Sequence, residues 1–381
     1  MKISRRKFAQ LLGAGAAAAV ARPAVTFAKS ATIDSTDGLV SSATVRLSSN
    51  ENPYGPCRKA LAAMDHAFGL SCRYPDKHAD ALVAALAELN GVERSRILLG
   101  DGSGEILKLA ADVFTGPQTK EKGGGRLIVA DPTFEAILHH AQLGGAEVVK
   151  VPLTSSWAHD LAKMSAAAKG GLVYICNPNN PTASITRKDE VRDFIRQLPN
   201  DTMVLVDEAY YHYADTPEYE SVIPLVADHP NLIVARTFSK IYGMAGLRCG
   251  YCVAQPATIE RLRARQSWDS INIMAIAAAR ASLADPAQVT NGRRLNADTR
   301  TFTITELEKM GFKSIPSQAN FVMFDAQRPV VPLIASLKSR QIEVGRLFPA
   351  MPNHLRLTIG KRSEMETFLA AFREVTTASA T

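Results

Sequence analysis

Seven short apolar runs, separated by helical stretches between about residues 96 and 253, constrain the fold of this chain more than any other feature. Several are nearly continuous in Val, Ile and Leu, as strands buried on both faces require. The runs are Ile97 to Leu99, Leu127 to Ala130, Val148 to Val151, Leu172 to Cys176, Met203 to Val206, Leu232 to Ala235 and Tyr251 to Val253. They predict an α/β fold with a seven-stranded, mainly parallel sheet covered by helices.

A smaller unit is predicted after residue 275. The pattern there is mainly helical as far as Phe312, and the later runs Asn320 to Phe324 and Leu355 to Ile359 favour strands. We therefore expect residues 73–274 to form a large domain. Residues 45–72 and 275–381 are expected to form a smaller α+β domain with an N-terminal arm.

The first 28 residues are typical of an export signal. The basic segment Ser4 to Phe8 contains paired arginines and precedes an apolar, small-residue run from Leu11 to Ala21. A membrane-anchoring helix is the alternative, but the run is shorter than the roughly 20 residues that span a bilayer. The pattern resembles a twin-arginine signal. It predicts cleavage after Ala28 or Ala21, passage through the twin-arginine translocation machinery and an exported, periplasmic mature protein.

Removal of this signal would change the charge of the chain. Residues 1–28 contain five basic and no acidic residues, so the formal net charge falls from +7 to +2. The small net charge of the remaining chain gives no reason to expect nucleic-acid binding. Residues 29–44 are small and polar and predict a flexible linker. The five scattered cysteines do not have the pattern of a disulfide framework.

Lys240 is the first candidate catalytic residue. It ends the segment Arg236-Thr237-Phe238-Ser239-Lys240 after a predicted strand. A lysine amine attacks an aldehyde only when it is unprotonated, and a desolvated cleft near cations favours that state. A single lysine is more often a solvated surface residue. The hypothesis therefore depends on the groups that the fold brings to Lys240.

A carboxylate stands at the carboxyl end of another predicted strand. Asp207 follows Met203 to Val206, and ligands of open α/β sheets bind beyond such strand ends. An anion there keeps a pyridine nitrogen protonated, which lets the ring accept electrons. Tyr210 could donate a hydrogen bond to the phenolate oxygen of the same ring. Metal binding or helix capping by Asp207 and Glu208 is the alternative.

Two more segments offer an amide and an anion site. Asn180 lies in the proline-rich turn Asn177 to Ala183, which can hold its amide rigidly, although an ordinary strand-to-helix turn is the alternative. Gly100 to Glu105 opens a predicted helix, whose backbone N–H groups and dipole bind phosphate. Its glycine spacing disfavours a dinucleotide fingerprint. The anion site would be completed by Thr237, Ser239 and Arg248.

Together these segments resemble the fold-type I pyridoxal-phosphate enzymes, and within them the histidinol-phosphate aminotransferases and their near relatives. The similarity runs from about Leu47 to the end of the chain. It also includes Leu47 to Pro56, Arg73 to Asp76 and Leu355 to Gly360. The resemblance implies pyridoxal 5'-phosphate as the cofactor, held by Lys240 as a Schiff base. Asp207 would pair with the ring nitrogen, and Tyr210 and Asn180 would hold the phenolate oxygen.

The same resemblance assigns further residues. Phe134 would stack on the cofactor ring, and phosphate contacts would come from Ser103, Gly104, Thr237, Ser239 and Arg248. Tyr74 would reach the phosphate in the neighbouring subunit, which implies a homodimer with shared active sites. Arg356 would grip the substrate carboxylate, a bidentate task suited to a guanidinium, and Tyr54 would close over the substrate.

The sequence departs from the family pattern at two places, and the second bears on the substrate. Ala183 stands where the family usually has glycine, and Glu343 to Phe348 lacks the paired arginines that commonly hold histidinol phosphate, leaving Arg346 as one charge. Together with export, this favours a different amino donor, with a 2-oxo acid as acceptor, in a transamination. A pyridoxal-phosphate decarboxylase, racemase or lyase is an alternative, and a non-catalytic binding protein on the same fold is another.

Overall fold

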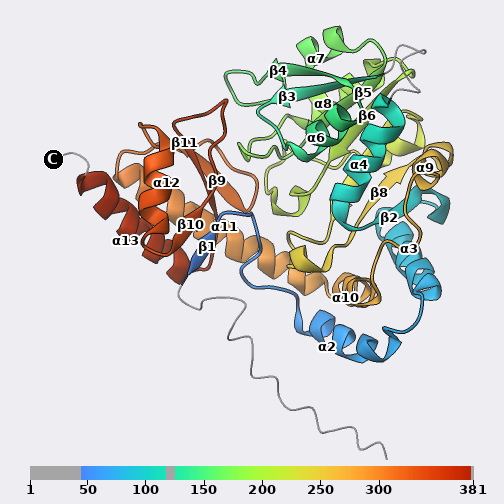
Figure 1. Ribbon diagram of the computed structural model, residues 1–381, viewed down its shortest axis with the longest axis horizontal. Coiled ribbons are helices and arrows are strands. Elements are labelled where there is room, and N and C mark those ends of the chain that lie inside the picture. Colours follow the sequence, from blue (N-terminus) through green and yellow to red (C-terminus); the bar gives the residue numbers. More distant parts are fainter. Residues whose placement is uncertain (1–43, 117–124, 379–381) are drawn as a thin grey trace, which may run out of the picture. The chain divides into compact units, whose positions relative to one another are not determined.

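The computed structural model describes residues 44–116 and 125–378 (Figure 1). The predicted export signal and all of the predicted linker except Thr44 lie outside the described residues. The described residues from Val45 onward form one compact unit, and the division of this unit into a large and a small domain stays a prediction. No helix within the described ranges combines the length and apolar character needed to cross a bilayer.

The main sheet has seven strands in the order β2-β8-β7-β6-β5-β3-β4 (Figure 1). Strand β8 is antiparallel to both of its neighbours, β2 and β7, and the other pairings of the sheet are parallel. The strands are β2 (Ile97–Gly100), β3 (Arg126–Asp131), β4 (Glu147–Pro152), β5 (Gly171–Cys176), β6 (Thr202–Asp207), β7 (Leu232–Thr237) and β8 (Gly250–Ala254). Each strand contains one of the seven apolar runs, so the predicted fold class is confirmed.

Two hydrophobic cores cover the two faces of this sheet. Val204 belongs to one core and its neighbour Leu205 to the other, because successive strand residues point to opposite faces. The first core includes residues of α3 (Asp76–Asn90), α7 (Leu161–Ala167), α8 (Lys188–Gln197) and α10 (Ile273–Leu283). The second includes residues of α4 (Gly102–Thr115), α6 (Ala136–Leu143) and α9 (Pro256–Arg263). Helices thus cover both faces of the sheet. Ligands of such sheets bind beyond the carboxyl ends of the strands.

Helix α8 illustrates how the sequence produces these layers. Its buried residues are Val191, Phe194 and Ile195, which lie three and four positions apart and therefore share one face of the helix. The opposite face carries charged residues such as Asp189 and Arg192, which form an exposed ion pair with each other. The helix consequently packs by one apolar stripe and presents its polar side to water.

A third core lies around the C-terminal strands. The antiparallel pair β9 (Phe321–Asp325) and β11 (His354–Thr358) corresponds to the two runs predicted there. A parallel pair, β1 (Val45–Leu47) with β10 (Ile342–Val344), was not predicted, because three residues are too few to show a period. The helices of this region are α11 (Pro286–Lys309), α12 (Val330–Lys338) and α13 (Arg362–Ala378).

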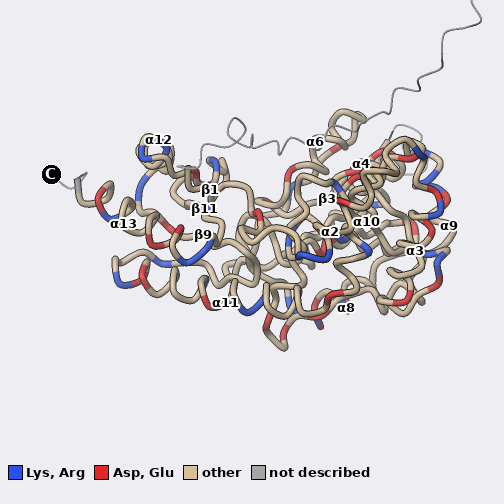
Figure 2. The backbone as a smooth tube through the Cα atoms, turned by 90° about the horizontal axis from the view of Figure 1, so that it is seen from below, with Lys and Arg blue, Asp and Glu red and all other residues tan. Residues whose placement is uncertain are grey.

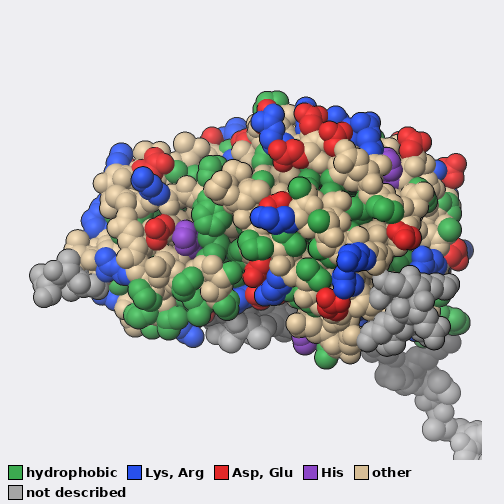
Figure 3. Space-filling model, turned by 90° about the horizontal axis from the view of Figure 1, so that it is seen from above, with side chains coloured by type: hydrophobic (Ala, Val, Ile, Leu, Met, Phe, Trp, Pro, Cys, Tyr) green, Lys and Arg blue, Asp and Glu red, His purple; other side chains and the backbone are tan. Residues whose placement is uncertain are grey.

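The remaining elements connect these layers. Helix α2 (Arg58–Ala67) packs against α10. Short 3₁₀ turns are η1 (Phe68–Leu70), η2 (Arg94–Arg96), η3 (Tyr211–Tyr213), η4 (Ile223–Ala227) and η5 (Ala245–Leu247). Basic and acidic residues are interspersed along the described chain (Figure 2). The face shown in Figure 3 likewise mixes hydrophobic, basic and acidic side chains.

Candidate active site

A cavity of about 250 Å³ lies where β5, β6 and β7 end. Cys176, Asp207 and Thr237, the last residues of these three strands, all line it. Most of the residues expected from the sequence also line it: Ser103, Gly104, Phe134, Asn180, Asp207, Tyr210, Thr237, Ser239, Lys240, Arg248 and Arg356. The structure therefore gathers groups from widely separated segments at one edge of the sheet.

Three expected residues lie outside this cavity. Tyr74 is 79% exposed and Tyr54 is 44% exposed, and neither contributes to the lining. Arg346 lines an adjoining cavity of about 420 Å³. The two cavities share Ser49 and Arg356. Arg346 therefore stands next to the main cavity, whereas Tyr54 and Tyr74 remain on the surface of this single chain.

Lys240 follows β7, and its Nζ donates a hydrogen bond to the Asn50 carbonyl oxygen at 3.0 Å. Burial and, next, the Arg356 guanidinium lower the pKa of Lys240 to about 8. Glu51 and Asp207 oppose this shift by their negative charge. Lys240 thus reaches the unprotonated, nucleophilic state far more readily than a solvated lysine does.

Asp207 ends β6 and is only 2% exposed. Its Oδ2 accepts a hydrogen bond from Tyr174 Oη at 2.9 Å, and its Oδ1 accepts one from the Ala209 backbone N–H at 3.1 Å. Burial raises the pKa of Asp207 to about 6, although these hydrogen bonds work against the shift. Above that pH the carboxylate is a buried anion that a cationic ligand atom would stabilise.

Two amides converge on the Tyr210 hydroxyl. Tyr210 Oη accepts hydrogen bonds from Asn50 Nδ2 at 3.1 Å and from Asn180 Nδ2 at 3.3 Å. Because both amides donate, the hydroxyl proton of Tyr210 is free to be donated into the cavity. Burial raises the pKa of Tyr210 well above its ordinary value, which keeps that proton in place.

The residues expected to bind an anion meet where α4 begins. Gly102 opens the helix, so Ser103 and Gly104 lie in its first turn, where backbone N–H groups are unpaired. Arg248 approaches this turn closely: a Cβ built on Gly102 would lie 2.2 Å from Arg248 Nη2. Gly102 also has a φ of +72°, so glycine is required there on both counts. Two hydroxyls from the end of β7 face the same region, and Thr237 Oγ1 donates to Ser239 Oγ at 3.0 Å.

Arg356 on β11 is 9% exposed and carries the main positive charge beside Lys240. Its Nη1 donates to Asn180 Oδ1 at 2.8 Å and its Nη2 to the Ser48 carbonyl oxygen at 2.6 Å. Its buried Nε has no hydrogen-bond partner among the described residues. Burial lowers the pKa of Arg356 to about 10. Such a guanidinium, held by neutral acceptors, is ready to bind a carboxylate.

Sequence reasoning missed several residues of this site. Asn50 lies within the segment Leu47 to Pro56 that carried the resemblance, but it had been given no role. Tyr174 appeared only as part of an apolar strand run, although its place two residues before Cys176 puts it on the same strand face. Glu208 and Arg236 adjoin Asp207 and Thr237 in the quoted motifs, and either could have been found from that adjacency.

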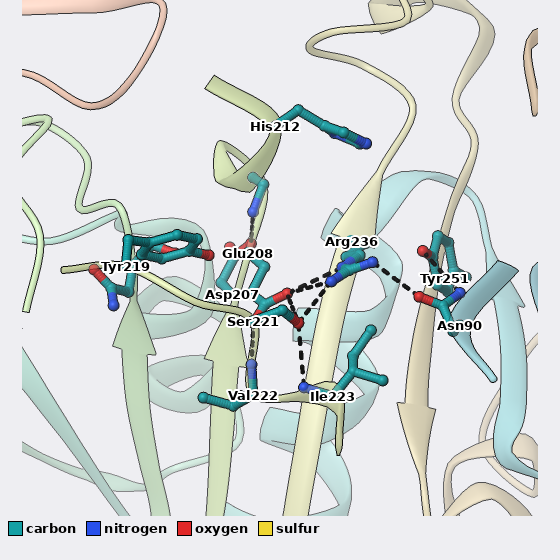
Figure 4. Close-up of polar contacts among 12 residues, drawn as sticks. Asn90, Asp207, Glu208, His212, Tyr219, Ser221, Val222, Ile223, Arg236 and Tyr251 are labelled. Atoms are coloured by element: carbon teal, nitrogen blue, oxygen red, sulfur yellow. Dashed lines mark hydrogen bonds and ion pairs between the residues drawn. The ribbon is translucent and has the colours of Figure 1, made fainter. Parts of the chain in front are cut away.

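Glu208 and Arg236 form a buried ion pair beside Asp207 and Thr237 in the sequence (Figure 4). Arg236 Nε and Nη2 donate to Glu208 Oε2 at 3.0 and 2.8 Å. Glu208 Oε1 accepts from the Val222 backbone N–H at 2.8 Å, and Arg236 Nη1 donates to Asn90 Oδ1 at 2.9 Å. Because Glu208 follows β6 and Arg236 lies in β7, the pair fixes the two strand ends that carry Asp207 and Thr237.

This arrangement disfavours the metal alternative for Asp207 and Glu208. Glu208 is occupied by Arg236 and by backbone N–H donation, so it has no free oxygen directed at the cavity. Within residues 44–116 and 125–378, no three His, Cys, Asp or Glu side chains are grouped so that they could hold a metal ion. The five cysteines are free thiols.

Comparison with known proteins agrees with this geometry. Residues 42–372 match the family model of aminotransferases class I and II. The histidinol-phosphate aminotransferase of Moorella thermoacetica is 38% identical over 336 residues, covering 87% of this chain and 85% of that protein. That of Symbiobacterium thermophilum is 38% identical over 332 residues, covering 86% and 90%.

A solved structure gives the same result for the fold. The histidinol-phosphate aminotransferase of Sinorhizobium meliloti, in complex with pyridoxal 5'-phosphate, superposes with a TM-score of 0.82 and 28% identity, covering 88% of this chain and 91% of that one. The expectations of a pyridoxal-phosphate cofactor and of aminotransferase activity are thereby confirmed. This chain belongs to the class I and II aminotransferases.

Proposed function

We propose that this aminotransferase takes its amino group from an α-amino acid, with Lys240 as the residue that binds the cofactor and moves the proton. The observation that carries the proposal is the position of the Lys240 amine. Its lowered pKa makes it nucleophilic, and it shares one cavity with the Asp207 carboxylate and the anion site at the start of α4.

The residues of the cavity fit pyridoxal 5'-phosphate group by group. Lys240 offers an amine to its aldehyde, and Asp207 offers an anion to its ring nitrogen. Phe134 lines the cavity beside them and offers an aromatic face. The phosphate would be held by Ser103, Gly104, Thr237, Ser239 and Arg248. When bound, the cofactor supplies an electron sink that stabilises negative charge at the substrate Cα.

Three side chains of the cavity would have separate roles in the reaction. Arg356 would hold the substrate carboxylate, and Tyr210 would donate a hydrogen bond from its hydroxyl to the phenolate oxygen of the cofactor. Lys240 Nζ would hold the cofactor in the resting enzyme and would move the proton that leaves the substrate Cα. Its pKa of about 8 suits both the acceptance and the release of a proton near neutral pH.

Covalent capture of the cofactor is expected to follow the titration of Lys240. Only the free amine reacts, and with a pKa of about 8 its fraction rises as the pH increases through that value. Between pH 7 and pH 9 the initial rate should therefore increase about tenfold. Stopped-flow absorbance after mixing cofactor-free protein with pyridoxal 5'-phosphate measures this rate. A midpoint near the ordinary lysine value of 10.5 would contradict the proposed environment.

The amino donor is tested with a panel of amino acids, histidinol phosphate and amines that lack a carboxylate, each with 2-oxoglutarate and other 2-oxo acids. Arg356 predicts that amino acids exceed their decarboxylated amines by about 100-fold in kcat/KM, because a buried guanidinium loses its bidentate partner. Formation of the 2-oxo product identifies transamination. Release of carbon dioxide without a 2-oxo product would overturn it, and a preference for histidinol phosphate would overturn the amino-acid donor.

We also propose that the enzyme is a homodimer in which Tyr74 reaches the cofactor phosphate of the other subunit. In the segment that precedes Tyr74, the large apolar side chains of Leu61 in α2 and Phe68 in η1 are 49% and 64% exposed, as is typical of interfaces. A cavity of about 750 Å³ between α2, α3 and α10 lies in the same region. Light scattering measures the mass, and Tyr74→Phe should weaken cofactor binding. A monomer with full cofactor affinity would contradict this.

Export through the twin-arginine route is proposed from the sequence of residues 1–28 alone. Paired arginines before an apolar run support this, and that route carries folded proteins, so the cofactor could be loaded before transport. Fractionation of cells that express the full chain should place it in the periplasm. Replacement of both Arg5 and Arg6 by lysine should leave the protein in the cytoplasm. Equal distribution of the two forms would count against export by this route.

A further inference from the structure

An ion pair joins the edges of the two cavities. Glu135 directly follows Phe134, which lines the main cavity, and its Oε2 accepts a hydrogen bond from Arg346 Nη2. Arg346 lines the adjoining cavity. The two side chains remain 51% and 54% exposed, so they are within reach of a ligand. The segment before α6 is thus tied to the segment after β10, next to the expected position of the substrate.

Other contacts hold Arg346 in this position. Its Nη1 donates to the Leu347 carbonyl oxygen at 3.0 Å, and its guanidinium carbon lies 4.4 Å from the centre of the Phe348 ring. The same ring lies 5.2 Å from the guanidinium carbon of Arg356. Phe348 is buried and therefore fixes the spacing of the two arginines. Arg356 serves the substrate carboxylate in the proposed function, so Arg346 marks where the rest of the substrate can extend.

The positive and negative side chains around Arg346 become equal in number when a substrate is bound. The adjoining cavity is lined by the basic residues Lys338, Arg346 and Arg356 and by the acidic residue Glu343. A bound substrate carboxylate neutralises Arg356, which leaves Lys338 and Arg346 against Glu343. Glu135 adds the second negative charge through its contact with Arg346. The side-chain end of the site then carries equal numbers of positive and negative charges.

We propose, resting on the function proposed above, that Glu135 makes this end of the site neutral and so selects amino acids with uncharged side chains. A carboxylate or phosphate on the substrate side chain must displace Glu135 from Arg346 and then lie beside the displaced carboxylate. An uncharged side chain leaves the pair intact and meets no such repulsion. Glu135 is thereby a specificity-determining residue that acts by keeping the Arg346 guanidinium in an ion pair.

Glu135→Gln tests this assignment, because it removes the charge and keeps the shape. An exposed ion pair contributes little to folding, so the variant should keep the melting temperature of the parent. The two substrates compared are glutamate and glutamine, whose side chains are nearly isosteric and differ in charge. The ratio of kcat/KM for glutamate to that for glutamine should increase about tenfold when Arg346 becomes free.

Two further variants make the result specific. In Glu135→Gln/Arg346→Gln the gain should disappear, because the freed guanidinium is the group that binds the side-chain carboxylate. Glu147→Gln breaks the exposed pair with Arg126, which lines neither cavity, and should leave the ratio unchanged. A gain that persists without Arg346 would show that Glu135 acts in another way and would overturn the assignment.

A binding measurement separates this inference from the proposed function. The holoenzyme is titrated calorimetrically with glutarate and with its monoamide, 4-carbamoylbutanoate. Like glutamate and glutamine, the two ligands differ by a carboxylate against an uncharged amide, but neither is turned over. Glu135→Gln should raise the relative affinity for glutarate about tenfold. Absence of turnover with every amino acid would refute the function while this titration still tested charge selection. An unchanged glutarate preference in Glu135→Gln would refute the role of Glu135.

Discussion

Replacement of Lys240 by arginine is expected to lower kcat/KM for transamination by at least about 10³- to 10⁴-fold. Arginine keeps the positive charge and can still donate to the Asn50 carbonyl oxygen, but it remains protonated at every accessible pH. It can neither attack the aldehyde nor accept the proton from the substrate Cα. Steady-state production of the 2-oxo acid measures the loss, and external amines such as methylamine should restore part of the activity.

Lys163→Arg supplies the matched control, because Lys163 on α7 is exposed and lines neither cavity. Its activity should remain close to that of the parent. Borohydride reduction followed by peptide mapping should place the cofactor adduct on Lys240 in both the parent and this control. If Lys240→Arg retained activity within tenfold of the parent, or if the adduct mapped elsewhere, the assignment of Lys240 would be wrong.

Replacement of Glu208 by glutamine is expected to lower the free energy of unfolding by about 3–5 kcal/mol. The substitution leaves the Arg236 guanidinium buried without its counter-ion, and Arg236 has a side chain only 7% exposed. Urea unfolding of the cofactor-free protein measures the change. Because Glu208 adjoins Asp207 and Arg236 adjoins Thr237, the dissociation constant of the cofactor should also increase.

The exposed pair between Arg126 and Glu147 gives the comparison for this prediction. Glu147 is 61% exposed in its side chain, so Glu147→Gln should change the free energy of unfolding by less than about 1 kcal/mol. In Glu208→Gln/Arg236→Met the buried charge is removed together with its partner, and part of the lost stability should return. Equal effects of Glu208→Gln and Glu147→Gln would contradict a structural role for the buried pair.

The sequence predicted the main sheet because its strands carry their own signal. A strand buried on both faces must be apolar at successive positions, and β5 and β7 are buried throughout. Strands β1 and β10 carry no such signal. They are three residues long, and Val45 pairs with Ile342, so their existence depends on contacts between distant parts of the chain. No local pattern could reveal that pairing.

The same distinction separates the site residues. Asp207 and Lys240 could be predicted because Asp207 ends one buried strand and Lys240 comes shortly after another, and parallel strands place such residues at one edge. The hydrogen bond from Asn50 to Tyr210 and the one from Arg356 to Asn180 join positions that only the folded chain brings together. The contact between Glu135 and Arg346 also links distant segments. The sequence therefore predicted Arg346 as an unpaired charge and could not predict its ion pair.

The segment that follows β1 has a practical consequence for handling this enzyme. The carbonyl oxygen of Ser48 accepts from Arg356, that of Asn50 accepts from Lys240, and the Asn50 side chain donates to Tyr210. Helix α13 contributes no residue to either the main or the adjoining cavity. An insertion or deletion between β1 and Asn50 would therefore disturb three reactive groups together, whereas an affinity tag attached beyond α13 would be the safer choice for purification.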